Sequence, residues 1–255
     1  MRTTSDSREE AAAAPQPFWR GIAWDRAWLA PYRHAGRDLC RRLESGASVA
    51  SALNEGADAG SLPRFVPHAQ LPGGEAYEAF IARTGAVPTR DNLHDLFNGL
   101  VWLAFPRVKR RLNELQAGQI ARLGIGPTRG VLRDALTLFD ENAAWLQASP
   151  ELVDALRRRD WRTLFIERRS DWPTARLTVF GHALLEKLAQ PRKAITAHVW
   201  CLPEDTVDAE SAVQDLLASD RLAARQPLPV LGVPGWWPGN EVPAFYDDPA
   251  VFRAR

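Results

Sequence analysis

Three polar side chains lie close together in a segment that is otherwise apolar. His94, Asp95 and Asn98 stand among leucine, phenylalanine and valine residues that recur at helical spacing. The four-residue step from His94 to Asn98 places both on one face of the expected helix. A neutral imidazole binds metals or moves protons near neutral pH, and a neighbouring carboxylate can fix its tautomer. His94 and Asp95 are therefore candidate catalytic residues and Asn98 a candidate ligand-binding residue; the alternative is an exposed, hydrogen-bonded helix face.

A second histidine has a carboxylate one helical turn away. His182 and Glu186 follow Gly181 in a short segment whose leucines recur at helical spacing. Such a pair supplies two ligands to one metal, or an acid with the partner that orients it. The second histidine of the zinc-peptidase pattern is absent, so the alternative is a plain hydrogen bond on the helix surface. We include both residues among the candidate catalytic residues.

Three carboxylates gather around a segment with the composition of a turn. Asp134 precedes Asp140 and Glu141, which lie between two apolar runs. Because aspartate and asparagine favour turns, we predict a β-hairpin over residues 136–147 with its turn at 140–142. Grouped carboxylates on a turn bind magnesium or another hard cation, together with phosphate oxygens. Asp134, Asp140 and Glu141 are therefore candidate metal ligands; the alternative is that they only form the turn.

Basic residues mark a candidate anion site. Lys109 begins a polar stripe at helical spacing that continues with Asn113 and Gln116. Arg129 and Arg133 flank the expected start of another helix. A helix N-terminus with nearby arginines is a favourable place for an anion. Lys109, Arg129 and Arg133 are therefore candidate ligand-binding residues for a small anionic ligand.

Two runs of basic residues, 109–111 and 157–159, raise the question of nucleic-acid binding. Neither run has interleaved aromatic residues or belongs to a known nucleic-acid motif, and such runs are more often solvated helix faces. The chain carries 32 lysine and arginine residues against 31 aspartate and glutamate residues, so no overall basic charge attracts a polyanion. The sequence disfavours nucleic acid as a partner.

The apolar pattern predicts the elements that must position these residues. Two consecutive helices are expected, one over 91–104 with Asp91 as its N-cap and one that starts at Pro106 and ends at Gly124. Further helices are expected at 49–53, 75–84, 150–159, 161–168, 180–188 and 205–218, and a short amphipathic helix includes Leu39 and Leu43. Extended segments are expected at 64–67 and 195–202.

Length and composition indicate one ordinary globular domain. The chain has 255 residues, of which 45% are hydrophobic and 25% charged. We predict an α+β fold: a predominantly helical single domain over residues 17–255, with a small β-hairpin or sheet and an extended, aromatic C-terminal tail at 227–255. Residues 1–16 are polar and rich in alanine, and they are expected to form a disordered leader.

Several classes of protein are disfavoured by what the sequence lacks. No run of 18 or more apolar residues is present, and Cys40 and Cys201 belong to no ligand or disulfide pattern. A cytoplasmic location without a membrane partner is therefore expected. The serine-hydrolase elbow, the dinucleotide-binding glycine pattern and the P-loop are absent. These absences argue against serine hydrolysis, hydride transfer and nucleotide hydrolysis of the P-loop kind.

Four longer segments carry a resemblance to a known family. They are NLHDLFNGLVWLAFPRVKRRLN, RDALTLFDENAAW, FGHALLEKLAQPRKAITAH and the tail PLPVLGVPGWWPGN with FYDDPAVFR. The chain resembles, over roughly residues 20–255, a bacterial and mainly proteobacterial family of single-domain proteins of unknown function. The resemblance implies an intact single domain and assigns no activity, cofactor or partner.

The sequence leaves three hypotheses for the function. The first is a cytoplasmic hydrolase or transferase-like enzyme whose polar site, assisted by a divalent metal, acts on an anionic substrate. The second is a non-catalytic module that binds a ligand or a protein with the same residues. The third is a nucleic-acid-binding protein that uses its arginine clusters. The first requires that the candidate residues converge in space.

Overall fold

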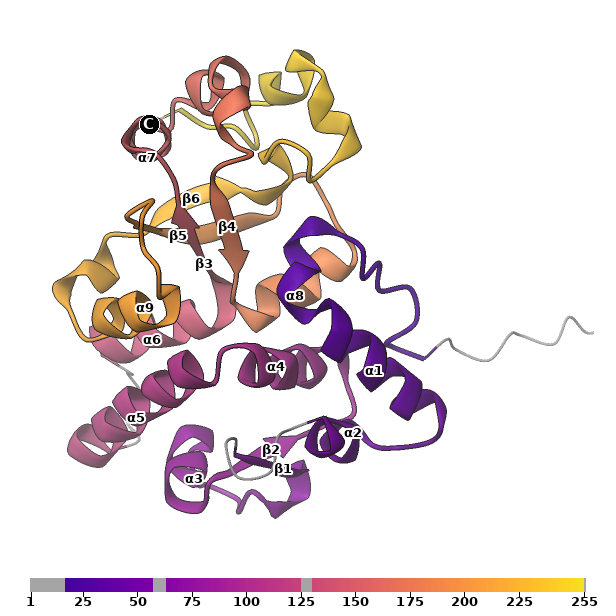
Figure 1. Cartoon of the computed structure of the whole chain (residues 1–255). Coiled ribbons are helices and arrows are strands. Elements are labelled where there is room, and N and C mark those ends of the chain that lie inside the picture. The colour runs from indigo at the N-terminus through magenta and orange to yellow at the C-terminus, as the bar shows by residue number, and fades with distance from the viewer. Residues whose placement is uncertain (1–16, 57–62, 125–129, 255) are drawn as a thin grey trace, which may run out of the picture.

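Two consecutive helices cross the middle of the molecule (Figure 1). The computed structural model describes residues 17–56, 63–124 and 130–254. Helix α4 (Leu93–Ala104) is separated by one residue from α5 (Pro106–Leu123). Pro106 opens α5, where the first turn needs no backbone N–H from it, and Gly124 follows its last residue with a φ of 72° that side chains rarely adopt. Both predicted helices are confirmed.

The N-terminus of α4 differs from the prediction by one residue. Asn92, rather than Asp91, caps the helix, because its side-chain oxygen accepts the backbone N–H of Asp95 at 2.7 Å. Asp91 instead accepts the backbone N–H of Val49 at 2.7 Å. Both side chains are good acceptors, and the register of the helix decides which of them reaches its first turn. The carboxylate of Asp91 thus joins two helices instead of capping one.

A small parallel sheet lies beside α4 and α5, at the bottom of Figure 1. Strand β1 (Arg64–Pro67) pairs with β2 (Ala86–Thr89), and α3 (Tyr77–Thr84) connects them. Helix α1 (Arg33–Glu44) precedes α2 (Val49–Glu55), which packs against β1 and α4. The predicted segment 64–67 is confirmed as a strand. Strand β2 was not expected from the sequence, because it is short and includes a proline.

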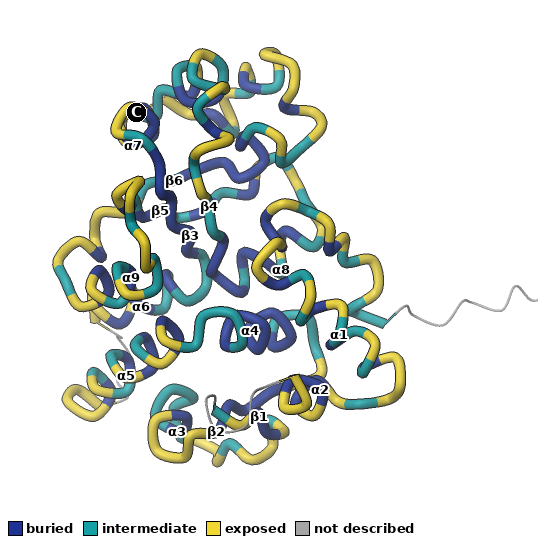
Figure 2. The backbone as a smooth tube through the Cα atoms, viewed as in Figure 1, coloured by how far each residue is buried: buried dark blue, intermediate teal, exposed yellow. Residues whose placement is uncertain are grey.

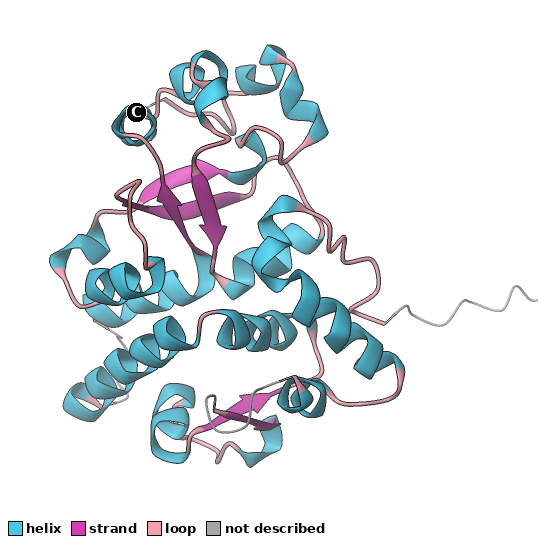
Figure 3. Cartoon of the chain, in the orientation of Figure 1, coloured by secondary structure: helices cyan, strands magenta, loops and turns pink. Residues whose placement is uncertain are grey.

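A four-stranded sheet lies on the other side of α4, with β3 at its centre. The order is β4-β3-β5-β6, where β3 (Ala143–Gln147) pairs antiparallel with β4 (Arg176–Val179) and parallel with β5 (Thr196–Leu202). The edge strand β6 (Gln226–Pro229) pairs antiparallel with β5. Every residue of β3 is buried, as expected for a central strand covered on both faces. Figure 3 shows the two sheets as separate small units among helices.

The predicted β-hairpin at 136–147 is wrong. Residues up to Asn142 belong to helix α6 (Val131–Asn142), and only β3 is extended. Leu136 and Phe139 are both fully buried three positions apart, which is helical spacing rather than the alternation of a strand. The turn-forming residues therefore occupy the last turn of α6, and β3 finds its partners among strands much later in the chain.

The remaining helices follow the predicted segments closely. They are α7 (Pro150–Arg158), α8 (His182–Ala189) and α9 (Ala209–Leu217). Ser149 caps α7 and Asp208 caps α9 through their side-chain oxygens. A π-helical turn occupies 163–167 and short 3-10 helices lie at 27–32, 68–70, 169–171, 220–223, 230–232, 238–241 and 243–247. The tail after residue 226 is thus one strand followed by 3-10 turns, with two of its aromatic residues, Tyr246 and Phe252, buried.

One connected apolar cluster includes residues from both sheets and from most helices. Figure 2 shows that β3 and much of α4 are buried. The fold is the predicted α+β arrangement, predominantly helical with small sheets. Within the described ranges, no helix combines the length and the hydropathy that crossing a bilayer requires. The predicted leader at residues 1–16 lies outside the described residues.

Two helical glycines provide a test of how tightly α4 is held. Gly99 in α4 directly faces the side chain of Leu53, which is fully buried, whereas a methyl group on Gly118 in α5 would meet nothing. We expect Gly118→Ala to raise the free energy of unfolding by about 0.5–1 kcal/mol through helix propensity. Gly99→Ala should lower it by about 1–3 kcal/mol because the core is overpacked. Urea unfolding of both variants measures this, and equal stabilisation would contradict the packing.

Candidate metal centre and its pocket

A cavity of about 440 Å³ lies between α3, α4, α5, α6 and α8. Its wall is lined by polar residues that lie far apart in the sequence, almost 90 positions in the case of Asp95 and His182. The stripe of Lys109, Asn113 and Gln116 on α5 also faces it, and all three of these residues are buried. A solvated helix would expose such a polar stripe to water. In α5 the stripe faces the cavity instead.

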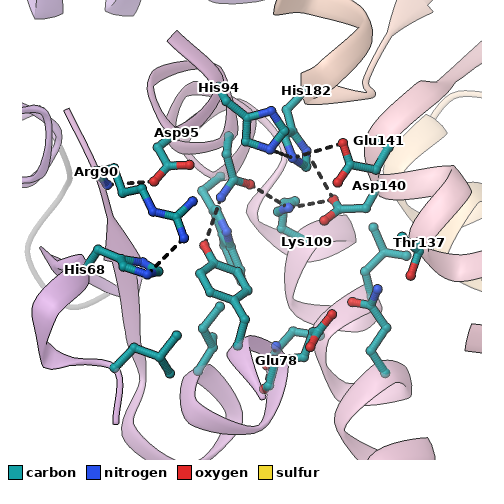
Figure 4. A pocket seen from close by; sticks show the side chains of 18 of the residues that line it. His68, Glu78, Arg90, His94, Asp95, Lys109, Thr137, Asp140, Glu141 and His182 are labelled. Atoms are coloured by element: carbon teal, nitrogen blue, oxygen red, sulfur yellow. Dashed lines mark hydrogen bonds and ion pairs between the residues drawn. The ribbon is translucent and has the colours of Figure 1, made fainter. Parts of the chain in front are cut away.

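Three side chains from three helices converge at one end of this cavity (Figure 4). His94 of α4, Glu141 of α6 and His182 of α8 each offer one ligand atom, and these atoms all lie within 4.8 Å of one another. The two Nε2 atoms of His94 and His182 are 3.0 Å apart, and Oε2 of Glu141 is 3.5 Å from Nε2 of His182. Two imidazoles and a carboxylate at these separations form a candidate site for a divalent transition metal.

The approach of α8 to the end of α6 brings His182 next to Glu141. The carbonyl oxygen of Ala143 accepts the backbone N–H groups of Phe180 at 2.9 Å and of Gly181 at 2.8 Å. Gly181 is so close to the backbone of Glu141 and Asn142 that a Cβ atom at this position would overlap it. A glycine is therefore required immediately before His182, the first residue of α8.

His94 is oriented by a carboxylate on the neighbouring helix. Its Nδ1 atom is 2.9 Å from Oε2 of Glu186 in α8. A carboxylate accepts, so Nδ1 of His94 carries the proton and Nε2 is left with its lone pair toward the centre. A histidine whose second nitrogen is held by a carboxylate is the usual arrangement around a protein-bound metal. Glu186 thus pairs with His94, and not with His182 on its own helix.

His182 is held neutral by its surroundings. Burial lowers the pKa of His182 to about 3, although the nearby carboxylate of Asp140 opposes that shift. Because His94 Nε2 accepts, Nε2 of His182 donates, and its Nδ1 is left unprotonated. That Nδ1 atom is buried without a hydrogen-bond partner among the described residues, 3.9 Å from Oδ1 of Asp140. A metal on Nε2 would move the proton to Nδ1, where it faces this carboxylate.

A second polar chain lies directly beside the triad. The Nζ atom of Lys109 donates to Oδ1 of Asp140 at 2.6 Å and to Oδ1 of Asn98 at 2.9 Å. Asn98 in turn donates to the hydroxyl of Tyr77 at 3.0 Å, and Lys109 lies over the ring of Trp102 at 5.4 Å. Burial raises the pKa of Asp140, but the charge and hydrogen bond of Lys109, together with the neighbouring His182 and His94, outweigh it and the pKa is lowered. Lys109, which is buried, and Asp140, which is partly exposed, therefore form an ion pair that is largely buried.

Glu141 differs from its neighbour because no lysine among the described residues forms an ion pair with it. Burial, followed by the negative charge of Asp140, raises the pKa of Glu141 above its ordinary value. A cation between Glu141 and the two histidines would relieve both effects, since it supplies the charge that this carboxylate lacks. The donor set, the neutral state of His182 and the unpaired Glu141 all fit a divalent metal.

The other candidate residues have different surroundings. Asp95 lines the cavity, but its Oδ2 atom accepts the backbone N–H of Arg90 at 2.6 Å. Arg133 is buried and Asp134 exposed, and neither lines the cavity. Arg129 lies outside the described residues. The metal ligands proposed from the sequence are thus divided: Glu141 joins the histidines and Asp140 pairs with Lys109.

Several residues of the cavity wall were not singled out from the sequence, and three of the polar ones matter here. Tyr77, His68 and Arg90 stand alone in the chain, each at the start or end of a short element. No spacing pattern connects them with the histidines, so pattern arguments could not find them. The aromatic hydroxyl of Tyr77 is buried, which raises its pKa. His68 and Arg90 lie on the side of the cavity away from Asp140 and Glu141 (Figure 4).

The arginine runs show the surroundings of ordinary solvated faces. Arg157 pairs with Asp154 and Arg111 with Glu114, each one turn along its own helix. Exposed pairs of this kind are common on helix surfaces and contribute little free energy. Nothing in these pairs favours a nucleic-acid interface.

The buried pair allows a thermodynamic test. Lys109→Met and Asp140→Asn should each lower the free energy of unfolding by about 3–5 kcal/mol, because each leaves a buried charge without its partner. The double variant should recover much of that loss, with a coupling energy of at least about 1 kcal/mol. The exposed pair Arg157 and Asp154 is the matched control, with an expected coupling under about 1 kcal/mol. Additive effects at Lys109 and Asp140 in urea unfolding would contradict a buried ion pair.

The close approach at Gly181 allows a second test. Gly181→Ala should lower the free energy of unfolding by about 1–3 kcal/mol, because the methyl group meets backbone that cannot move aside cheaply. Gly73, which is exposed and has open space around its Cα, provides the control variant Gly73→Ala. Urea unfolding compares the two. Equal stabilities would mean that α8 does not depend on this contact.

Comparison with known proteins places the chain in a family. A family model described as "Protein of unknown function (DUF3025)" matches residues 63–255, which include every residue of the triad. Neither the curated proteins nor the solved structures compared with the chain include a match. The match covers well over half of the chain, and this protein therefore belongs to the DUF3025 family of proteins of unknown function.

Proposed function

We propose that this protein is a metal-dependent hydrolase whose divalent metal is held by His94, Glu141 and His182. The observation that carries the proposal is the convergence of these three ligand atoms within 4.8 Å, from three separate helices, on the wall of a cavity. The carboxylate of Glu186 behind His94 supports it further. Arrangements that serve only the packing of a core have no need of two imidazoles with their Nε2 atoms 3.0 Å apart.

The ligand set favours zinc. Two histidines and one glutamate are a common catalytic set for this ion, and three protein ligands leave a position for water or substrate. Structural zinc sites instead use four protein ligands, mostly cysteine, whereas the two cysteines here lie apart from the triad. The same set also binds iron(II) in oxygenases, which makes a non-haem iron enzyme the second candidate. Identifying the bound metal distinguishes the zinc hydrolase from the iron enzyme.

The chain's own residues supply the remaining parts of a hydrolytic site. When bound, the metal lowers the pKa of a coordinated water and polarises a carbonyl or phosphoryl oxygen. Glu186 keeps His94 in the tautomer that can bind it, and the buried surroundings of His182 keep that imidazole neutral. Lys109 holds the carboxylate of Asp140 in a fixed place beside His182.

We also propose a cytoplasmic location and a bacterial source. Both cysteines, Cys40 and Cys201, carry free thiols, which fits a reducing compartment. The resemblance found in the sequence supports the bacterial source. The single-domain arrangement over 17–255 stays part of this proposal, and one apolar cluster that joins both sheets supports it.

Metal content tests the proposal directly. Protein purified without a histidine tag should contain about one zinc per chain by elemental analysis, since three ligands converge on one point. His94→Ala, His182→Ala and Glu141→Gln should each lose the metal. Glu186→Gln should retain it with about 10–100-fold weaker affinity, because Glu186 acts through His94.

Matched controls keep this experiment interpretable. His34 and Glu204 are exposed and form no contact with the triad, so His34→Ala and Glu204→Gln should keep the full metal content. Iron in place of zinc would favour the oxygenase. Folded wild-type protein that takes up no zinc, iron or manganese after dialysis would refute the metal centre. Stoichiometric metal without hydrolysis of nitrophenyl esters or phosphates would favour a non-catalytic binding module.

A further inference from the structure

One cation on the cavity wall has its charge available for a ligand. Arg90 follows β2, and Figure 4 shows its side chain extending from the end of that strand toward the cavity. We propose that Arg90 binds an anionic group of the substrate, a carboxylate or a phosphate, while the bond to be broken lies at the metal. This inference rests on the proposed function and names the class of substrate for it.

The partner of Arg90 shows that its charge is not neutralised. The side chain of Arg90 contacts Nε2 of His68 at 2.9 Å, and among the described residues it forms no ion pair with a carboxylate. A guanidinium has only donors, so Nε2 of His68 is the acceptor and carries no proton. The imidazole is then neutral, with its proton on Nδ1. The two side chains together hold one positive charge.

The tautomer of His68 that accepts from Arg90 leaves one buried ring nitrogen without a partner in the described part of the chain. Its Nδ1 atom is buried and has no hydrogen-bond partner among the described residues. An alternative tautomer, with the proton on Nε2, would clash with the donors of Arg90. The structure thus keeps a histidine in a form that leaves one polar atom unpaired, and the result is a guanidinium held over the cavity. Arg90 itself is exposed, so an anion from solvent can reach its guanidinium.

The other cation on the cavity wall already has a carboxylate partner. Lys109 is buried and its charge is paired with Asp140 at 2.6 Å. Arg83, near the rim, is paired with Glu75 in the same way. An anion entering the cavity therefore finds the metal and Arg90, and these two attract it together.

The distance between Arg90 and the centre is fixed by the backbone. Asp95 accepts the backbone N–H of Arg90 at 2.6 Å, and its own backbone N–H is held by Asn92 at 2.7 Å. Asp95 is next to His94 in the first turns of α4. The buried carboxylate of Asp95 thus ties the end of β2 to the helix that carries a metal ligand. A substrate would need its anionic group at a set distance from the reacting bond.

The acidic residues on the wall limit the substrate further. Among the described lining residues, Glu78, like Glu141, has no ion pair with a lysine or an arginine, and Figure 4 shows it away from Arg90. A second anionic group on the substrate, placed near Glu78, would be repelled. The substrate class is therefore a compound with one anionic group at the Arg90 end and a hydrolysable bond at the metal.

Dicarboxylates of increasing length test this geometry, because one carboxylate can bind the metal while the other binds Arg90. Isothermal titration of the zinc-loaded protein would compare malonate, succinate, glutarate and adipate with acetate. One length should bind about 10-fold or more tightly than acetate, as expected for an added charge-assisted contact. Arg90→Gln should remove this preference for length. Arg64→Gln, on the adjacent strand β1, is the control and should retain it, because Arg64 is exposed and does not line the cavity.

The outcomes separate this inference from the proposed function. Equal profiles for Arg90→Gln and Arg64→Gln, or no dicarboxylate better than acetate in the wild type, would overturn the role of Arg90. If the protein takes up no metal, the hydrolase proposal fails, and the titration of metal-free protein with acetate decides on Arg90 alone: loss of binding in Arg90→Gln but not in Arg64→Gln supports it, and equal binding refutes it. A parallel series with inorganic phosphate shows whether phosphate or carboxylate is preferred.

Discussion

The contact between Gly181 and the backbone of Glu141 and Asn142 determines the geometry of the whole centre. It brings the end of α6 against the start of α8, so that Glu141 and His182 are neighbours although 40 residues of sequence separate them. The carbonyl of Ala143 accepts two backbone N–H groups from the same junction. The sheet continues from this point, since β3 follows α6 directly and β4 leads into α8. The same junction between α6 and α8 therefore positions both the strands of the sheet and the ligands Glu141 and His182.

A polar cavity inside an apolar core is stable only if its charges are paired. Lys109 is the residue that makes this possible, because it satisfies Asp140 and Asn98 at once and lies over an aromatic ring. A buried ion pair of this kind contributes little net stability, since desolvation offsets most of the attraction. Its value here is specificity: it fixes the side chain of Asp140 beside His182 and leaves Glu141 alone to face the histidines.

The sequence predicted the helices better than the site, and the reason is physical. Helices α4 and α5 have long periodic patterns with a proline and a glycine at their ends, so local interactions determine them. The segment around Asp140 has the residue types of a turn but the apolar spacing of a helix. It forms a helix because this buries Leu136 and Phe139. Strands β2 and β6 contain prolines, which local pattern arguments exclude from strands.

Most candidate polar residues were found from their types, but their partners were not. His182 and Glu186 appeared to be a pair on one helix, whereas Glu186 reaches His94 across the gap between two helices. Such pairings depend on how α8 packs against α4, and a single sequence contains no measure of that packing. Arg90 and His68 could not be predicted as site residues, because neither has a neighbour in the sequence that suggests a site.

Buried side-chain atoms without a hydrogen-bond partner among the described residues occur in several parts of the structure, and three of them, on His68, Trp102 and His182, line one cavity. Nδ1 of His182 and Nδ1 of His68 are buried without a partner among the described residues, and the charge of Arg90 has no counter-ion there. Folded proteins leave few buried polar groups unpaired, because each costs about 1–3 kcal/mol. The two histidines belong to opposite walls of the same cavity. A metal on Nε2 of His182 would leave the proton on Nδ1, facing Asp140, and an anion at the opposite wall would supply the counter-ion of Arg90.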